Sequence, residues 1–241
     1  MSEVTLKELL EAGAHFGHQA RRWNPKMKKY IYGERGGVHI LDLVQTKQGL
    51  DEAVEYVKKM VGEGKVILFV GTKRQAAGIV KDRAVAVGMP YLTQRWVGGL
   101  LTNWQEISKR IRKLHEMKEK REKGEYKVYT KKEQLLLDRE IAKLDKFLGG
   151  VAALEKLPDA LFVVDTHREE VAVLEANRMG IPVVGIVDTN ADPDKIDYVI
   201  PSNDDAVKAI ELIVMEIANS IANSKHEILN PKQIPNSNDK S

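Results

Sequence analysis

The chain has 241 residues, of which 43% are hydrophobic and 30% are charged, and it contains no cysteine. This length and composition are typical of one large folded domain, or of one domain with an insertion, and the lack of cysteine excludes disulfides and thiolate metal sites. No run approaches about 18 apolar residues and the N-terminus does not resemble a signal peptide, so we expect a cytoplasmic protein with no membrane partner.

The net charge of +3 is unevenly distributed along the chain. Residues 1–103 carry 16 basic and 10 acidic side chains, residues 104–150 carry 14 and 9, and residues 151–241 carry 8 and 16. This asymmetry predicts a polyanionic partner for the first two blocks, and a different partner or an ion for the acidic block. Ordinary solvated surface charge is the alternative interpretation.

The elements of the first hundred residues follow from the hydrophobic pattern. Thr5 and Glu8 form a capping box for a short helix. The mixture of glycine, aromatic and basic residues that follows predicts an ordered loop or hairpin outside the core. In chain order we expect a helix at 5–12, this loop at 13–37, a strand at 38–41, a helix at 43–62 capped by Asp42, a strand at 65–70, a helix ending near 87 and a strand near 91–92.

A charged segment at residues 103–148 interrupts the alternation of strands and helices. Apolar residues recur there at helical spacing, at Ile107, Ile111, Leu114, Leu137, Ile141, Leu144 and Leu148. Their narrow stripe predicts two helices that pair as an antiparallel coiled-coil hairpin. We therefore expect residues 1–103 and 149–224 to form a single α/β domain, with residues 104–148 inserted into it.

The alternation then resumes towards the C-terminus. We expect a strand at 159–164, a helix at 169–179, strands at 182–187 and 196–200, a helix at 204–221 and a disordered tail at 225–241. Strands separated by helices indicate a three-layer α/β sandwich with a mostly parallel sheet. The functional edge of such a sheet lies at the C-terminal ends of its strands.

The turn from Gly71 to Gly78 connects a strand to a helix, which is where many nucleotide sites lie. It matches neither phosphate-binding fingerprint, so a nucleotide-dependent enzyme is disfavoured. The chain also lacks a G-x-S-x-G nucleophile elbow. Lys73 and Arg74 remain candidates for contact with RNA phosphates, although an ordinary helix start explains them equally well.

Basic and aromatic residues are interleaved between Arg21 and Arg35. Cations bind phosphates, and aromatic planes stack on unpaired bases, so this segment predicts RNA binding. A solvated basic loop is the alternative. The candidate RNA-binding residues here are Arg21, Arg22, Trp23, Asn24, Lys26, Lys28, Lys29 and Tyr30.

A second aromatic and basic group surrounds the diglycine Gly98–Gly99. Arg95, Trp96 and Asn103 are candidates for RNA contact. The alternative is structural: the tryptophans fill the junction between insertion and core, and Thr102 or Asn103 caps the inserted helix.

Acidic residues follow several predicted strands. Asp188, Asp204 and Asp205 are expected to converge at neighbouring strand ends, where His15 or His18 joins them if the N-terminal segment folds back. Carboxylates with one imidazole suit Mg²⁺ or Zn²⁺. The alternative is local: Asp204 caps the last helix, and Asp188 begins a turn.

Together these motifs resemble the family of bacterial small-subunit ribosomal protein two. The resemblance extends over about residues 5–222 and is carried by Ala12–His18, Trp23–Met27, Val38–Leu43, Phe69–Ala76, Gln94–Gly99, Leu101–Trp104, Pro158–Asp165, Glu169, Glu175, Gly180–Val184, Asp188–Asn190, Asp192–Pro193, Ile200–Pro201 and Asn203–Asp205. The loop Thr166–Arg168 and Ser202 depart from the family pattern.

The resemblance implies a flavodoxin-like fold with a protruding coiled coil, and a cytoplasmic, ribosome-bound protein without enzymatic activity or a required cofactor. The implied partners are small-subunit ribosomal RNA and neighbouring ribosomal proteins, including the large messenger-binding ribosomal protein one. In that setting Arg110, Arg112, Lys113 and Lys120 would place the hairpin against RNA. An enzyme on the same scaffold, and a protein-interaction scaffold acting through the coiled coil and acidic face, are the competing hypotheses.

Overall fold

A five-stranded parallel sheet forms the centre of the molecule, which a computed structural model describes for residues 3–229. The strand order is β5-β4-β6-β7-β8, and every neighbouring pair is parallel. The strands are β4 (Ile67–Val70), β5 (Tyr91–Leu92), β6 (Ala160–Val164), β7 (Val183–Val187) and β8 (Tyr198–Pro201). The predicted parallel α/β architecture is confirmed, and it is consistent with a flavodoxin-like sandwich.

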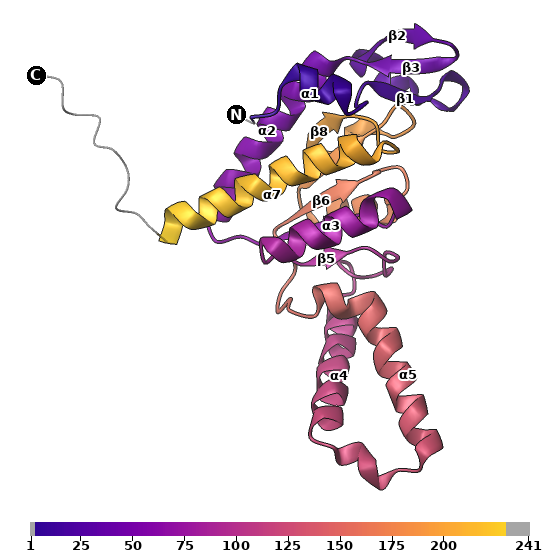
Figure 1. Cartoon of the computed structure of the whole chain (residues 1–241), viewed down its shortest axis with the longest axis vertical. Helices are drawn as coiled ribbons and strands as arrows, with labels where there is room; N and C mark the ends of the chain where they lie inside the picture. The colour runs from indigo at the N-terminus through magenta and orange to yellow at the C-terminus, as the bar shows by residue number, and fades with distance from the viewer. Residues whose placement is uncertain (1–2, 230–241) are drawn as a thin grey trace, which may run out of the picture.

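Helices cover both faces of this sheet because its central strands are apolar on both sides. One core cluster joins one sheet face to α2 (Leu43–Gly62), α3 (Arg74–Ala86) and α7 (Val207–Leu229). The other cluster joins the opposite face to α6 (Glu170–Met179) and to the base of the inserted helices. In Figure 1, α3 and α7 lie side by side in front of the strands.

The N-terminal segment forms a second sheet, antiparallel and of order β1-β3-β2. It follows α1 (Leu6–Glu11) and contains β1 (Phe16–Gln19), β2 (Ile31–Arg35) and β3 (Val38–Leu41), with the short 3-10 helices η1 (Ala20–Arg22) and η2 (Pro25–Tyr30) between β1 and β2. The strand predicted at residues 38–41 is present, but it does not join the parallel sheet expected from the alternation of strands and helices. It pairs with β1 and β2 because residues 13–37 supply strands as well as loops.

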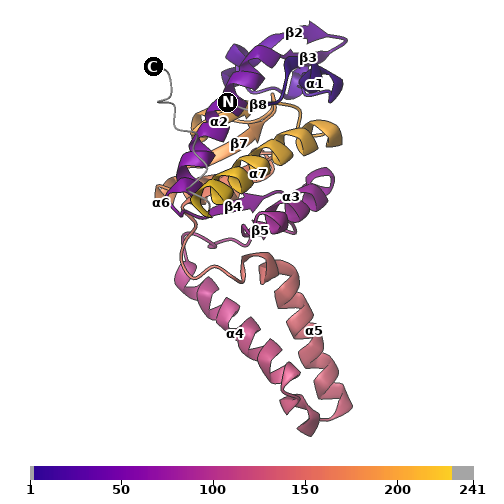
Figure 2. The ribbon, with the colours of Figure 1, turned by 60° about the vertical axis from the view of Figure 1, so that its left-hand side comes forward.

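Two helices occupy the segment between β5 and β6. α4 (Trp104–Glu122) and α5 (Lys131–Leu148) are connected through η3 (Glu125–Val128) and are followed by η4 (Gly149–Val151). They project from the body at the end opposite to the N-terminal sheet (Figures 1 and 2). Coiled-coil packing of this pair stays a prediction.

The C-terminal helix differs from its prediction at both ends. α7 begins at Val207, because Asn203 Oδ1 accepts the backbone N–H groups of Asp205 and Ala206 at 2.8 and 3.2 Å and holds them in a turn. The alternative interpretation of Asp204 as a helix cap is therefore wrong, because its Oδ1 accepts from Lys73 and its Oδ2 has no partner among the described residues. The helix continues to Leu229, so the predicted tail does not begin at residue 225, and residues 230–241 lie outside the described part. Within residues 3–229, no helix has the length and apolar character needed to cross a membrane.

Candidate nucleic-acid interface and cation-binding cluster

The N-terminal sheet is fixed to the C-terminal edge of the parallel sheet through Thr189. The Thr189 hydroxyl accepts the backbone N–H of His18 at 2.9 Å, and its carbonyl accepts the N–H of Asn24 at 2.7 Å. Gly17 permits this approach, since a Cβ there would lie 2.5 Å from Thr189 Cγ2. The segment that carries the basic and aromatic residues is thereby held against the body.

Several of the predicted RNA-binding residues are exposed around η1, η2 and β2. We name as the N-terminal basic surface the exposed residues Arg21, Arg22, Trp23, Lys28, Lys29 and Tyr32. Tyr32 is 83% exposed, although it was not among the candidates selected from the sequence. Tyr30 is half-buried and packs against the core, whereas Asn24 uses its side-chain oxygen to cap η2 by accepting the N–H of Lys26.

Three of the predicted phosphate ligands are held by carboxylates instead. Lys26 Nζ lies 2.9 Å from both Asp192 and Asp194 and ties η2 to the loop before β8. Lys113 Nζ lies 2.6 Å from Glu140 across the helical pair. Both pairs are on the surface and contribute little to stability, but they leave the two ammonium groups less available to RNA.

Lys73 is the third of these residues, and it is buried. Its ammonium lies 2.6 Å from both Asp204 Oδ1 and Asp205 Oδ1, and 3.3 Å from Asp165 Oδ2. Three carboxylates surround the three hydrogens of the ammonium, so the expected contact with an RNA phosphate does not fit. The neighbouring Arg74 is exposed at the start of α3.

The diglycine segment is organised by Glu175, one of the residues that carry the family resemblance, although the sequence did not predict this contact. The buried Glu175 carboxylate accepts the Trp96 indole N–H at 2.9 Å and the backbone N–H of Gly99 at 2.8 Å. It also accepts the backbone N–H groups of Leu101 and Thr102 and the Thr102 hydroxyl, at 3.1, 3.2 and 3.1 Å. Trp96 is thus buried at the base of the insertion, which favours the structural interpretation.

Asn103 begins α4 without a side-chain capping bond, and the Thr102 hydroxyl serves Glu175 rather than the helix. The capping role that the alternative interpretation gave to Thr102 or Asn103 is therefore wrong. Arg95 is exposed beside the buried Trp96. On α4, the predicted contacts Arg110, Arg112 and Lys120 are also exposed.

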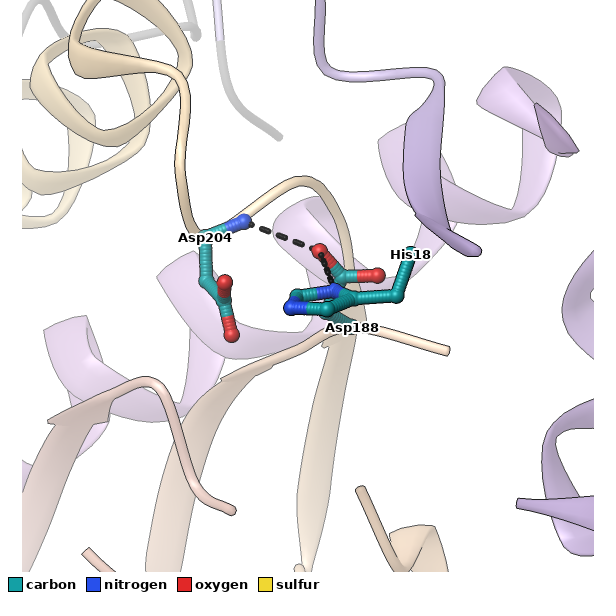
Figure 3. Close-up of side chains that lie close together, drawn as sticks. All are labelled: His18, Asp188 and Asp204. Atoms are coloured by element: carbon teal, nitrogen blue, oxygen red, sulfur yellow. Dashed lines mark hydrogen bonds and ion pairs between the residues drawn. The ribbon is translucent and has the colours of Figure 1, made fainter. Parts of the chain in front are cut away.

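The acidic cluster comes together as the sequence predicted, with His18 rather than His15. His18 Nδ1 lies 3.0 Å from Asp188 Oδ2, and His18 Nε2 lies 3.6 Å from Asp205 Oδ2. The backbone N–H of Asp204 donates to Asp188 Oδ2 at 3.3 Å. Figure 3 shows His18, Asp188 and Asp204 converging from β1, the end of β7 and the loop after β8; one ligand atom from each lies within 4.8 Å of the others.

Burial and like charge dominate the electrostatics of this cluster. Burial raises the pKa of Asp204 well above its usual range; Asp188 and Asp165 raise it further, and Lys73 opposes them. The hydrogen bond to Asp188 raises the pKa of His18. Asp204 Oδ2 is buried and has no hydrogen-bond partner among the described residues. Such an arrangement favours an additional positive group beside these carboxylates.

The fold and these sites define a doubly wound α/β protein with a basic N-terminal surface, an acidic cluster at its strand ends and a projecting pair of helices. Residues 9–224 match the model of the family described as Ribosomal protein S2. The chain therefore belongs to the ribosomal protein S2 family, as its resemblance predicted, which makes it a small-subunit ribosomal protein of a structural rather than an enzymatic family.

Proposed function

We propose that this protein is a structural component of the small ribosomal subunit that binds ribosomal RNA through its N-terminal basic surface. The observation that carries this proposal is the grouping of four exposed cations, Arg21, Arg22, Lys28 and Lys29, with two exposed aromatic side chains on a segment fixed to the body. Family membership supports the ribosomal setting. In that setting the protein is cytoplasmic and ribosome-bound.

The chemistry of the surface suits folded RNA. Guanidinium and ammonium groups neutralise phosphates and release counterions, which supplies most of the affinity. Trp23 and Tyr32 are 36% and 83% exposed, so each has a face on which an unpaired base can stack. Because the segment is held by Thr189, little conformational entropy is lost when RNA binds.

The helical pair supplies a second candidate contact. Arg110, Arg112 and Lys120 are exposed on α4, at the end of the molecule opposite to the N-terminal basic surface (Figure 1). Arg74 and Arg95, exposed on the body, complete the set of cations that we assign to RNA. Lys26, Lys73 and Lys113 are left out because carboxylates already bind them.

The salt dependence of binding to small-subunit ribosomal RNA tests the first contact. Replacing Arg21 and Arg22 by alanine should weaken binding and reduce the magnitude of the log–log salt slope by about 1.4–1.8, since each lost phosphate contact contributes about 0.7–0.9. The control replaces Lys81 and Lys208, exposed on α3 and α7, by alanine. It removes the same amount of positive charge outside the N-terminal basic surface. Equal slopes for the two double variants would contradict the assignment of the N-terminal basic surface.

Sedimentation of the full chain from lysate through a sucrose gradient tests ribosome association. We expect comigration with small subunits at low salt and release as salt rises. A chain that stays at the top of the gradient at low salt would contradict the proposal.

We also propose, from the family resemblance, that the protein helps to dock the large messenger-binding ribosomal protein one. The acidic C-terminal block supports a protein partner, since it carries twice as many acidic as basic side chains. Small subunits reconstituted with and without this chain should differ in their content of protein one. An equal content in the two preparations would contradict the docking role.

The acidic cluster is proposed to bind a divalent cation. The partnerless Asp204 Oδ2 and the nearby Asp188 and His18 fit the requirement for converging ligands. The imidazole favours Zn²⁺ over Mg²⁺, which prefers oxygen ligands alone. Lys73 competes for Asp204 Oδ1, which leaves Oδ2 for the cation.

Thermal unfolding tests the cation site. Zn²⁺ at about a hundredfold excess over its dissociation constant should stabilise the wild type by about 2.7 kcal/mol. His18→Gln should lose this gain, and Asp194→Asn, which removes an exposed carboxylate outside the cluster, should retain it. If neither Zn²⁺ nor Mg²⁺ raises the unfolding midpoint of the wild type, the cluster is not a cation site.

A further inference from the structure

A pocket lies where the parallel sheet reverses its winding direction. From β4 the chain crosses one face of the sheet through α3 and enters β5, which lies beside β4 on one side. From β6 it crosses the opposite face through α6 and enters β7, which lies beside β6 on the other side. The C-terminal ends of β4 and β6 therefore flank a topological switch point. In open α/β sheets this crevice is where ligands bind, because the two connections diverge and leave a gap between them.

The residues that line the pocket come from three segments after these strands. Thr72 follows β4, Arg168, Glu169 and Val171 follow β6, and the loop after β5 supplies Gln94, Arg95, Trp96 and Gly98. The pocket has a volume of about 460 Å³. This is within the range of small-molecule sites, which begins at about 300 Å³.

Two exposed guanidinium groups face this pocket, from Arg95 and Arg168. Arg168 Nε donates to the Thr72 hydroxyl at 3.2 Å, which holds the side chain against another lining residue and leaves its terminal nitrogens for a ligand. The acidic group that lines the pocket, Glu169, is buried and accepts both the backbone N–H and the hydroxyl of Thr72. Burial raises the pKa of Glu169, so its negative charge is disfavoured at this position.

The wall formed by the loop after β5 is rigid because Glu175 binds it from beneath. The carboxylate holds the Trp96 indole and the Gly99 backbone, on either side of Gly98. Arg95 is adjacent to this anchored tryptophan. The pocket is therefore formed before a ligand arrives, with an aromatic and aliphatic wall from Trp96 and Val171 beside the two cations.

We infer that this switch-point pocket binds a phosphate-bearing nucleotide, with Arg95 and Arg168 on the phosphate and the base against the exposed Val171, beside the small part of Trp96 that lines the pocket. Paired guanidinium groups favour a phosphate, and the apolar wall favours a planar base over inorganic phosphate alone. The nucleotide comes from one of two sources, an unpaired nucleotide of RNA or a free nucleotide. With RNA as the source, the inference rests on the proposed function.

Calorimetric titration of the full chain with the four nucleoside 5′-monophosphates tests the inference. We expect at least one to bind, and Arg95→Gln and Arg168→Gln each to weaken it about tenfold through loss of a charge-assisted hydrogen bond. The matching nucleoside without phosphate, and inorganic phosphate without a base, should both bind more weakly. Arg178→Gln is the control, because Arg178 is exposed at the far end of α6 and does not line the pocket.

Binding of small-subunit ribosomal RNA by the same variants distinguishes the sources. A loss with Arg95→Gln and Arg168→Gln, but not with Arg178→Gln, supports an RNA nucleotide in the pocket even where monophosphates bind too weakly to detect. Arginine-dependent monophosphate binding with unchanged RNA affinity supports a free nucleotide.

The inference is overturned if no monophosphate binds and both pocket variants bind RNA like Arg178→Gln. The double variant Arg21→Ala/Arg22→Ala, measured in parallel, separates this failure from that of the proposed function. If that variant loses RNA affinity while the pocket variants do not, RNA binding by the N-terminal basic surface is supported and nucleotide binding in the pocket is contradicted.

Discussion

Glu175 shows how one buried carboxylate can organise a loop. Its hydrogen bonds reach Trp96 and the backbone of the segment that begins the inserted helices. Burial alone would raise its pKa, but the hydrogen bonds from Trp96 and from the backbone outweigh that effect and lower the pKa below 4.5. The charged form is therefore the one that the folded protein stabilises.

We expect Glu175→Gln to destabilise the protein by about 2 kcal/mol, because an amide NH₂ would face N–H donors that the carboxylate oxygens now accept. Urea unfolding at neutral pH measures the change. Glu170→Gln is the control, since Glu170 is 56% exposed and pairs with Lys195 on the surface, where such pairs contribute little. An effect of Glu175→Gln no larger than that of the control would contradict the role of the charge.

The pH dependence of this difference follows from the lowered pKa of Glu175. A carboxyl whose folded-state pKa lies below its unfolded-state value of 4.5 stabilises the fold fully above that value. The contribution is lost as pH falls through the folded-state pKa. The stability difference between wild type and Glu175→Gln should therefore shrink when unfolding is measured at about pH 4 and below, and a difference that grows in acid would contradict this prediction.

At the scale of elements, the strands of the parallel sheet could be predicted because burial on both faces requires an unbroken apolar run. All four residues of β4 and all five residues of β6 are buried, and each run ends at a turn sequence. The convergence of Asp188 and Asp204 was predictable for a related reason: neighbouring parallel strands end at one edge.

Other features depend on contacts between distant segments, which local patterns do not encode. β3 alternates half-buried and buried residues and is apolar enough for either sheet; its antiparallel partners β1 and β2 decide the outcome. The ion pair of Lys73 with Asp204 joins residues 131 positions apart, and the bond of Trp96 to Glu175 spans 79. In the sequence, Lys73 at a helix start therefore has the features of a phosphate ligand, because its acidic neighbours in space are distant along the chain.

The packing of α2 against β8 provides a prediction for an element. A Cβ at Gly49 would lie 2.2 Å from the Val199 carbonyl oxygen, so Gly49→Ala must push the helix away from the strand. We expect a loss of about 1–3 kcal/mol, as for overpacked cores. Gly62→Ala, at the last residue of the same helix, meets nothing within 4 Å and should not destabilise the protein.

Thermal or urea unfolding of the two variants checks this pair. If both variants lose stability, α2 does not tolerate an added methyl group at either position. The loss in Gly49→Ala would then have a cause other than a clash with β8. A stable Gly49→Ala variant would show that α2 shifts along the sheet at little energetic cost.

At the scale of the molecule, the two candidate RNA contacts lie at opposite ends of the long axis, the N-terminal basic surface at one end and α4 at the other (Figure 1). Two contacts on one chain act as a bivalent ligand, in which the first raises the effective concentration of the second. Such binding requires an RNA whose own contact points have a matching separation, which favours folded ribosomal RNA over a short single strand.

The contact at α4 depends on three exposed cations. Replacing Arg110, Arg112 and Lys120 by glutamine should weaken binding to small-subunit ribosomal RNA and reduce the salt slope by about 2.1–2.7, for three phosphates at about 0.7–0.9 each. The control replaces Lys131, Lys132 and Lys143 by glutamine, and it removes the same amount of positive charge from α5. Equal effects of the two triple variants would indicate diffuse attraction to the whole hairpin rather than a contact through α4.

Combining the α4 variant with Arg21→Ala/Arg22→Ala tests whether the two ends act together. Contacts that share no residues and lie far apart should contribute additively, so the slope reductions should sum. A combined reduction no larger than either alone would mean that the ends compete for one stretch of RNA, and the bivalent arrangement would then be wrong. Additive reductions would support simultaneous contact of both ends of the protein with the ribosomal RNA.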